Sequence, residues 1–208
     1  DSVGSYAFNG CSNLVSAIIE DGVTKIGSNA FKGCYNLTEL EIPNSVTNIS
    51  SAALSGCSGL KKLTIPFVGS RRGNTGKSDS VFGYIFGTSS YSGARLTRQY
   101  YLSSSYYDYF IPANLVTVVV TDETILGAGA FSGCKFLKDV VFTNSVVSIK
   151  EYALNECSGL LELEIPDSVT SIGKSAFVGC KRLASVTIPD SVTTIGKSAF
   201  ASCKSLKN

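Results

Sequence analysis

Seven cysteines divide the chain into equal steps. Each follows the previous one by 23 residues, except for a single gap of 77 residues between Cys57 and Cys134. A large apolar residue, here called the anchor, stands three positions before every cysteine and is always preceded by alanine. The anchors are Phe8, Phe31, Leu54, Phe131, Leu154, Phe177 and Phe200. A fixed period of this length is typical of repeat proteins, whose units pack only on their neighbours. Residues 1–208 are therefore predicted to form one solenoid.

Aligned on cysteine, the units share the pattern C-x-x-L-x-x-L-x-I-P-x-S-V-T-x-I-G-x-x-A-F-x-G. The alternation of Leu40 and Ile42 predicts a short strand with one buried face. Pro43 then ends the strand, because proline has no N–H to donate to a ladder. The glycine of the I-G step permits a positive φ, and A-F-x-G-C has room for about one helical turn. One unit buries too little apolar surface to offset its ordering entropy, so several must stack.

This unit resembles the BspA-like leucine-rich repeat, a class of 23-residue repeats typical of surface proteins in host-associated bacteria and some parasitic protists. The resemblance covers the chain outside residues 67–111. It implies an α/β solenoid, a right-handed leucine-rich-repeat superhelix with a parallel concave β-sheet and short helical turns on the convex side. It also implies an extracellular location, at the cell surface or secreted, often with a role in adhesion or host interaction. It supplies no catalytic residue, because the repeat motif is structural throughout.

The ends of the chain and its overall charge bear on the extent of the repeat array and on the kinds of partner to expect. The chain contains no methionine and begins and ends inside repeats, which predicts a fragment of a longer array. A net charge of +2 does not indicate a nucleic-acid partner. The longest strongly apolar stretch, residues 115–120, is far shorter than a membrane span, so no membrane insertion of this segment is expected. Nothing in the sequence indicates the oligomeric state.

The cysteines themselves are predicted to be free, buried thiols that act as small hydrophobic residues. Neighbouring strands are close enough for disulfides, but the cysteines are odd in number and all occupy the same position of the unit. There is no C-x-x-C pair and no histidine, which argues against a zinc site and against a Cys-His catalytic pair. We therefore expect no metal, no cofactor and no enzymatic activity.

The 77-residue gap is resolved by following the anchors. Phe86, in the segment YIFG, replaces the missing A-F-x-G anchor and leaves spacings of 32 and 45 residues on its two sides. Two insertions of about 9 and about 22 residues therefore flank one degenerate repeat within residues 67–111. Insertions in solenoids map to loops, and such loops often bind ligands.

The composition of residues 67–111 differs from that of the repeats. The segment holds four of the five arginines and seven of the ten tyrosines, and these residue types dominate recognition surfaces. The candidate binding residues are Arg71, Arg72, Arg95, Arg98, Tyr100, Tyr101, Tyr106, Tyr107 and Tyr109. The alternative is that aromatic residues of the segment only pack it onto the solenoid. We favour packing for Phe82, Tyr84, Ile85 and Phe86.

The concave sheet is a second candidate surface, because leucine-rich repeats usually bind there. Its exposed positions make a mildly acidic face, and the candidate binding residues are Glu39, Glu41, Glu162 and Glu164. These charges could equally serve solubility and discourage aggregation between sheets.

Together these features predict a non-catalytic, extracellular module that binds a host or cell-surface protein or a glycan. The alternative is a structural spacer, a rigid repeat array that displays another domain.

Overall fold

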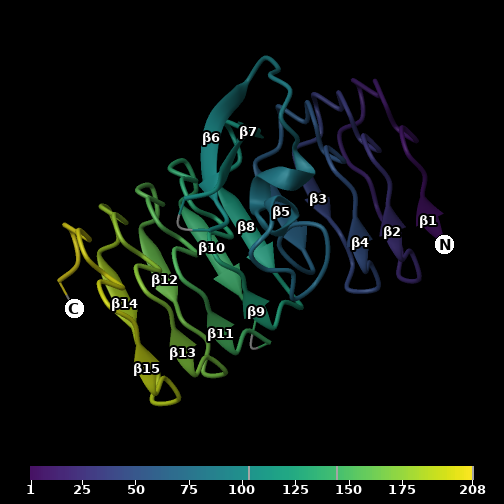
Figure 1. Ribbon diagram of the computed structural model, residues 1–208. Coiled ribbons are helices and arrows are strands. Elements are labelled where there is room, and N and C mark those ends of the chain that lie inside the picture. Colours follow the sequence, from purple (N-terminus) through teal and green to yellow (C-terminus); the bar gives the residue numbers. More distant parts are fainter. Residues whose placement is uncertain (103, 144, 208) are drawn as a thin grey trace.

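The computed structural model describes residues 1–102, 104–143 and 145–207, which form a β-solenoid of about eight turns. Successive turns lie side by side from the N-terminal to the C-terminal end (Figure 1). Corresponding residues of neighbouring turns pair in parallel, as Leu40 does with Leu63. The parallel sheet predicted from the repeat is therefore confirmed.

The main ladder is formed by the strands predicted at the L-x-I step. It comprises β3 (Glu39–Glu41), β5 (Lys62–Ile65), β8 (Thr117–Val120) and β10 (Asp139–Phe142), continued by the pair β12 (Glu162–Glu164) and β14 (Ser185–Thr187). The ladder crosses the interruption without a break, because Leu63 of β5 pairs directly with Val118 of β8. Both side chains are fully buried. The insertions therefore branch from parts of the turn that lie outside the main ladder.

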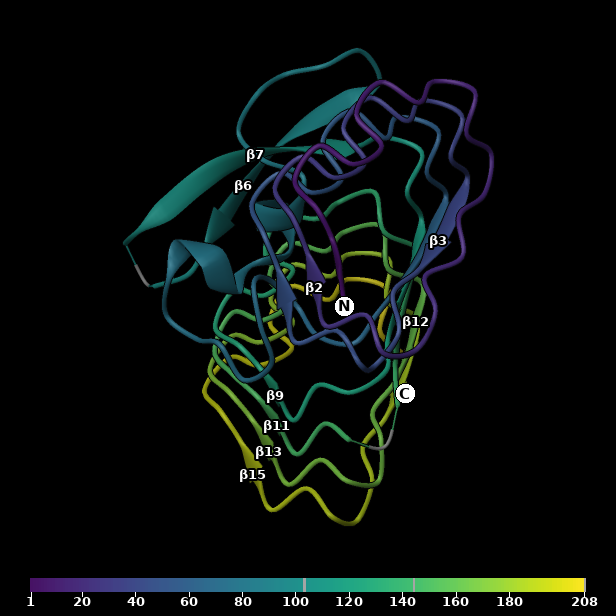
Figure 2. The ribbon, with the colours of Figure 1, turned by 90° about the vertical axis from the view of Figure 1, so that its right-hand side faces the viewer.

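A second parallel ladder forms where the sequence predicted only a turn. It comprises β1 (Ser2–Val3), β2 (Lys25–Ile26) and β4 (Asn48–Ile49) before the interruption, and β9 (Ile125–Leu126), β11 (Ser148–Ile149), β13 (Ser171–Ile172) and β15 (Thr194–Ile195) after it. Figure 2 looks along the solenoid and places the two ladders on opposite sides of the turns. The apolar core fills the space between them.

The glycine after each second-ladder strand has a different role from the one expected. Gly27 and Gly173 are not among the residues with positive φ. A Cβ added at Gly27 would collide with the backbone of Ser5 in the preceding turn, and one at Gly173 with the backbone of Glu151. Glycine is therefore required here by close approach of neighbouring turns, not by its own conformation.

The predicted helical turns on the convex side are wrong. Among the described residues, the structure contains only two short 3-10 helices, η1 (Ser78–Ser80) and η2 (Phe82–Ile85), and both lie in the interruption. In a regular turn, Asn29 and Gly33 adopt positive φ angles of 55° and 75°, which a continuous helix does not allow. The N–H of Phe31 instead donates to the carbonyl of Ala53 in the next turn, at 2.8 Å. The segment is thus a series of reverse turns bonded to its neighbours.

All seven cysteines are free. Most of them form a column in which each thiol donates to the anchor carbonyl of the preceding turn, as Cys57 Sγ does to Phe31 O at 3.2 Å. The same bond recurs for Cys34, Cys157, Cys180 and Cys203. Burial raises the pKa of Cys57 and Cys157 to about 12, so these thiols keep the proton that they donate. Cysteine therefore serves as a hydrogen-bond donor as well as a small hydrophobic residue.

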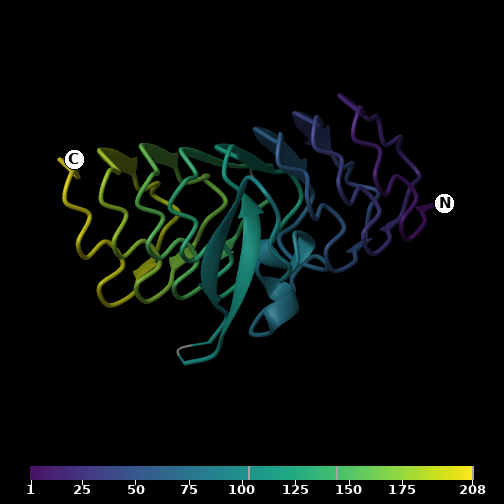
Figure 3. The same ribbon diagram turned by 90° about the horizontal axis from the view of Figure 1, so that it is seen from above.

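The larger insertion is an antiparallel hairpin that the sequence did not predict. Its strands are β6 (Ala94–Tyr100) and β7 (Tyr106–Pro112), with Thr97 paired to Tyr109. Figure 3 shows the hairpin lying across the anchor turns, with its tip projecting beyond the solenoid.

Candidate recognition site

In the interrupted turn, Phe86 and Phe82 share the role of the anchor: Phe86 holds the anchor position toward the preceding turn, and Phe82 holds it toward the following turn. Toward the preceding turn, Ile85 O accepts a bond from Leu54 N at 2.8 Å, the contact that the residue before an anchor makes elsewhere. Toward the following turn, Phe82 replaces Phe86: its N–H donates to Ala130 O at 2.8 Å, and its ring lies 4.9 Å from that of Phe131. Phe82, Ile85 and Phe86 are buried, as predicted, and Tyr84 is half-buried.

Gln99 of β6 replaces backbone donors that the interrupted turn lacks. In regular turns, the N–H of the glycine two residues after the anchor donates to the next turn, as Gly33 does to Ser55 O at 2.8 Å. In the turn of Phe131, the equivalent acceptor, Ser132 O, receives Gln99 Nε2 at 3.2 Å instead. The same Nε2 lies 3.3 Å from Ala130 O, and Gln99 Oε1 accepts the N–H of Gly83. The fully buried Gln99 amide therefore fastens the hairpin to the core.

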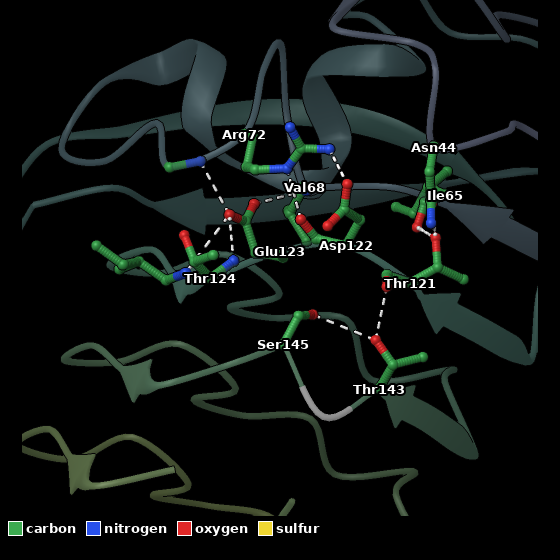
Figure 4. Close-up of polar contacts among 12 residues, drawn as sticks. Asn44, Ile65, Val68, Arg72, Thr121, Asp122, Glu123, Thr124, Thr143 and Ser145 are labelled. Atoms are coloured by element: carbon green, nitrogen blue, oxygen red, sulfur yellow. Dashed lines mark hydrogen bonds and ion pairs between the residues drawn. The ribbon is translucent and has the colours of Figure 1, made fainter. Parts of the chain in front are cut away.

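Glu123 replaces a backbone acceptor in the same way on the second-ladder side (Figure 4). Elsewhere the backbone N–H at the position of Thr124 donates to the preceding turn, as Thr47 N does to Thr24 O at 2.8 Å. Thr124 N instead donates to the carboxylate of Glu123 at 3.1 Å. The same carboxylate accepts the N–H groups of Gly73 at 2.9 Å and Val68 at 3.3 Å. Glu123 is only 2% exposed, and it holds the smaller insertion against the core.

Arg72 adds a second attachment for this loop. Its Nε donates to Asp122 O at 2.6 Å, and its Nη2 pairs with the Asp122 carboxylate (Figure 4). Arg71 beside it is exposed. The structure therefore separates two residues that the sequence grouped together, because Arg72 holds the loop and Arg71 faces solvent.

Tyr109 joins the two insertions. Its hydroxyl donates to Ser78 O of η1 at 2.7 Å, and its side chain is 3% exposed. Burial raises its pKa above the ordinary tyrosine value. Tyr109 therefore packs the hairpin onto the solenoid, and we exclude it from the proposed contact surface.

The outer face of the hairpin presents a fixed arginine among aromatic and aliphatic side chains. Arg98 pairs with Asp108 on the opposite strand through two bonds, Nε to Oδ1 at 2.8 Å and Nη2 to Oδ2 at 2.9 Å. Its guanidinium also lies 4.1 Å from the ring centre of Tyr106, and Tyr106 lies 5.4 Å from Tyr100. Leu96 on the same face is 61% exposed. We call Leu96, Arg98, Tyr100, Tyr106 and Asp108 the hairpin face.

The remaining tyrosines form a row on the other side of the hairpin. Because side chains alternate along a strand, Tyr107 and Tyr109 point away from the hairpin face. Ring centres are 6.2 Å apart for Tyr101 and Tyr107, and 6.1 Å apart for Tyr107 and Tyr109. Tyr107 is 48% exposed, so this row runs from the buried interior to solvent near the hairpin tip.

The acidic residues predicted on the main ladder are exposed but divided into two groups. Glu39 and Glu41 line a groove of about 450 Å³ that also contains Lys62. Glu162 and Glu164 line another of about 460 Å³ with Asp139. No charged side chain lies on β8 between the two groups. The main ladder therefore offers two shallow acidic grooves, and neither includes a residue of the hairpin face.

Sequence reasoning missed both Gln99 and Glu123, although each left a signal. Gln99 is the only glutamine in the chain. Glu123 stands where the other units have the buried valine of S-V-T, as at Val46 and Val169. A carboxylate at a core position indicates a local set of donors, because an unpaired buried charge is costly.

The repeat pattern, the two parallel ladders and the anchor column define a leucine-rich-repeat protein. The chain belongs to the family described as BspA type leucine rich repeat region, whose model matches residues 1–74 and 105–208 in six copies. The unmatched residues, 75–104, include the whole of β6.

Three solved structures illustrate the similarity. A leucine-rich repeat protein of T. pallidum is 24% identical, with 100% of this chain and 72% of that chain covered and a TM-score of 0.47. One from Bacteroides ovatus is 21% identical, covering 99% and 59%, with a TM-score of 0.49. A leucine rich cell surface protein of Faecalibacterium prausnitzii is 24% identical, covering 100% and 68%, with a TM-score of 0.46. Such distant likenesses assign no ligand.

No curated protein matches the chain. Within the part of the chain that the structure describes, no helix has the length and apolar character needed to cross a membrane.

Proposed function

We propose that the chain is a non-catalytic recognition module that acts outside the cell, at a cell surface or in secreted form. Its partner is a host or cell-surface protein or a glycan, as in adhesion, and the hairpin face is the principal contact surface. The observation that carries this proposal is a fixed arginine, flanked by the exposed Tyr106 and the half-buried Tyr100, on a hairpin fastened to the solenoid through the buried side chain of Gln99.

The chemistry of the hairpin face suits recognition. Arg98 is held by Asp108 and Tyr106, so little conformational freedom remains to be lost when a partner binds. Two of its five N–H donors are engaged by Asp108, which leaves donors for a ligand. Tyr100 and Tyr106 add large amphipathic area at a low entropy cost. This combination of tyrosine and arginine is typical of binding hot spots.

The test is a binding screen against host matrix proteins, cell-surface proteins and a glycan array. Any ligand found is then measured with Arg98→Ala, Tyr106→Ala and the quadruple variant of Arg71, Arg72, Arg95 and Arg98 to alanine. We expect affinity to fall at least tenfold in each. The matched control is Arg182→Ala, which removes an exposed arginine from a regular turn. Unchanged affinity in the quadruple variant would remove the insertion from the binding site.

A second candidate function is a rigid spacer that displays another domain. It is favoured by the unbroken register of the main ladder across the interruption, where Lys62 to Ile65 pair with Thr117 to Val120. This function depends on array length and not on the hairpin face. Shortening the array by whole repeats in the full-length protein would then impair function, while Arg98→Ala and Tyr106→Ala would leave it intact.

A further inference from the structure

A groove of about 590 Å³ lies where β6 meets the turns that follow it. One wall is β6, which contributes Arg95, Arg98 and Tyr100. The opposite wall comes from the turns of the Phe131 and Leu154 repeats, which contribute Lys135, Asn155 and Glu156. Its volume is within the range of pockets that hold small ligands.

The charges in the groove are only partly compensated. Arg98 is paired with Asp108 at 2.8 Å, and Glu156 faces Lys181 at 4.0 Å. Arg95 and Lys135 make no ion pair with any residue that the structure describes. Both are exposed, so a ligand reaches them without displacing a protein partner. The two unpaired cations favour an anionic ligand.

The outer edge of β6 is unsuited to an additional peptide strand. A Cβ added at Gly133 would lie 2.5 Å from Arg98 O, and one added at Gly129 would overlap Tyr100 O. The backbone of β6 is therefore in direct contact with the turns at these two glycines. A peptide that extends a sheet needs a free row of backbone donors and acceptors, and along Arg98 to Tyr100 this row is covered.

The side chains, in contrast, suit a ring-shaped polyol. A smaller cleft of about 190 Å³ is lined by Tyr100, Leu102, Tyr152 and Asn155, and it shares Tyr100 and Asn155 with the groove. This cleft adds a second aromatic side chain, Tyr152, to the surface that a ligand could contact. Asn155 Nδ2 makes only a long bond, 3.4 Å to Ser132 Oγ, so its amide remains available to hydroxyl groups.

We propose that this groove binds an acidic saccharide, meaning a sugar chain that carries carboxylate or sulfate groups. Arg95 and Lys135 receive the acidic group, Tyr100 provides a surface for the sugar ring, and Asn155 with Glu156 bonds to ring hydroxyls. The assignment rests on the proposed recognition function and names its ligand class.

The test is isothermal titration calorimetry of the whole chain with three defined probes. A heparin-derived tetrasaccharide carries sulfate, trigalacturonic acid carries carboxylate, and maltotriose is the neutral control. We expect at least one acidic probe to bind at a single site and maltotriose not to bind. The comparison of the two acidic probes shows whether sulfate or carboxylate is preferred.

The variants locate the site. Arg95→Ala and Lys135→Ala are each expected to weaken binding of the acidic probe at least tenfold, while Arg182→Ala changes it less than twofold. Tyr100→Ala is expected to lose binding and Tyr100→Phe to retain it, because only the ring is needed. Thermal unfolding of each variant checks that it is folded.

Three outcomes would overturn the saccharide assignment: no binding of either acidic probe, an equal loss in Arg182→Ala, or tighter binding of polyglutamate that is also sensitive to Arg95→Ala. If neither acidic probe binds but a ligand from the surface screen still depends on Arg98, the saccharide assignment fails while the recognition function stands.

Discussion

The regular repeats and the interrupted turn both have to pair their buried hydrogen-bonding groups and fill their core, and they do so in different ways. In the repeats, backbone groups and recurring side chains satisfy one another at each step, and phenylalanine anchors of neighbouring turns stack in parallel. The rings of Phe177 and Phe200, for example, are 5.0 Å apart with an angle of 9° between their planes. In the interrupted turn, the rings of Phe82 and Phe131 are inclined by 45°, and single side chains replace the missing backbone partners.

This difference explains how an insertion is tolerated within a solenoid. An inserted segment removes donors and acceptors that the flanking turns need, and a buried unpaired polar group costs about 1–3 kcal/mol. Gln99 supplies a donor toward the following turn, and Glu123 supplies an acceptor on the second-ladder side. The hairpin is therefore part of the rigid body. The outer face of the hairpin does not pack on the solenoid core, so residues suited to recognition can accumulate there.

The largest effect is expected at the junction of the two regions. Phe131→Ala should lower the free energy of unfolding by about 3–5 kcal/mol, because it removes a fully buried ring that contacts Phe82. Chemical denaturation measures the change. A loss below about 1 kcal/mol would show that Phe131 is not a core residue that stabilises the repeats and the interrupted turn together.

The next effect is expected at Gln99. Gln99→Met keeps a similar length but removes the amide, which leaves Ser132 O and Gly83 N without these partners. We expect a loss of about 1–3 kcal/mol in the free energy of unfolding. The matched control is Thr97→Val, which removes only a local bond to Arg95 O on the same strand. Equal losses in the two variants would contradict a special role for Gln99.

A smaller effect is expected in the regular column. Cys157→Ala removes the thiol that donates to Phe131 O at 3.1 Å and should cost about 1 kcal/mol. Cys11→Ala is the control, because Cys11 is the exposed member of the seven cysteines. If Cys157→Ala is as neutral as Cys11→Ala, the bond from the Cys157 thiol to Phe131 O makes no measurable contribution to stability.

The smallest effect is a pH dependence at Glu123. Burial raises the pKa of its carboxyl above the ordinary 4.5, although bonds from Gly73 and Val68 N–H partly oppose the shift. The folded state then binds this proton more tightly than the unfolded state, so the contribution of Glu123 to stability falls as pH rises through the raised pKa. The neutral amide of Glu123→Gln lacks this dependence. The stability of the variant relative to the natural chain should therefore rise from pH 4.5 toward neutrality.

Urea denaturation at several pH values measures this difference, and the exposed Glu164→Gln provides the control. A constant offset in Glu123→Gln across the range would show that the Glu123 carboxyl titrates alike in the folded and unfolded states.

The regular part of the fold could be predicted from the sequence because its determinants are local and repeated. Leu40, Pro43 and the anchors recur at fixed spacing, and they place the main strands and the buried column. The second ladder escaped prediction because two-residue strands such as Lys25–Ile26 have too short an alternation to detect. The helical turns were wrong because the left-handed residues that exclude a helix, such as Asn29, are not restricted to glycine.

Composition could predict where the candidate site lies, but not which of its side chains face solvent and which pack inside. The tyrosines and arginines mark the segment, yet only the strand pairing separates Tyr106 on the hairpin face from Tyr107 on the other side. Tyr109 is buried and bonds to Ser78 O, a contact between the two insertions that no local pattern encodes.

The central claim, that the hairpin is as firmly held as the repeats, is tested most directly by amide hydrogen exchange followed by mass spectrometry. Peptides covering β6 and β7 should exchange as slowly as those covering β3 and β5. In Gln99→Met, exchange in the hairpin should accelerate while β12 and β14 remain protected. Rapid exchange of the hairpin in the natural chain, at the rate of unstructured amides, would contradict the claim.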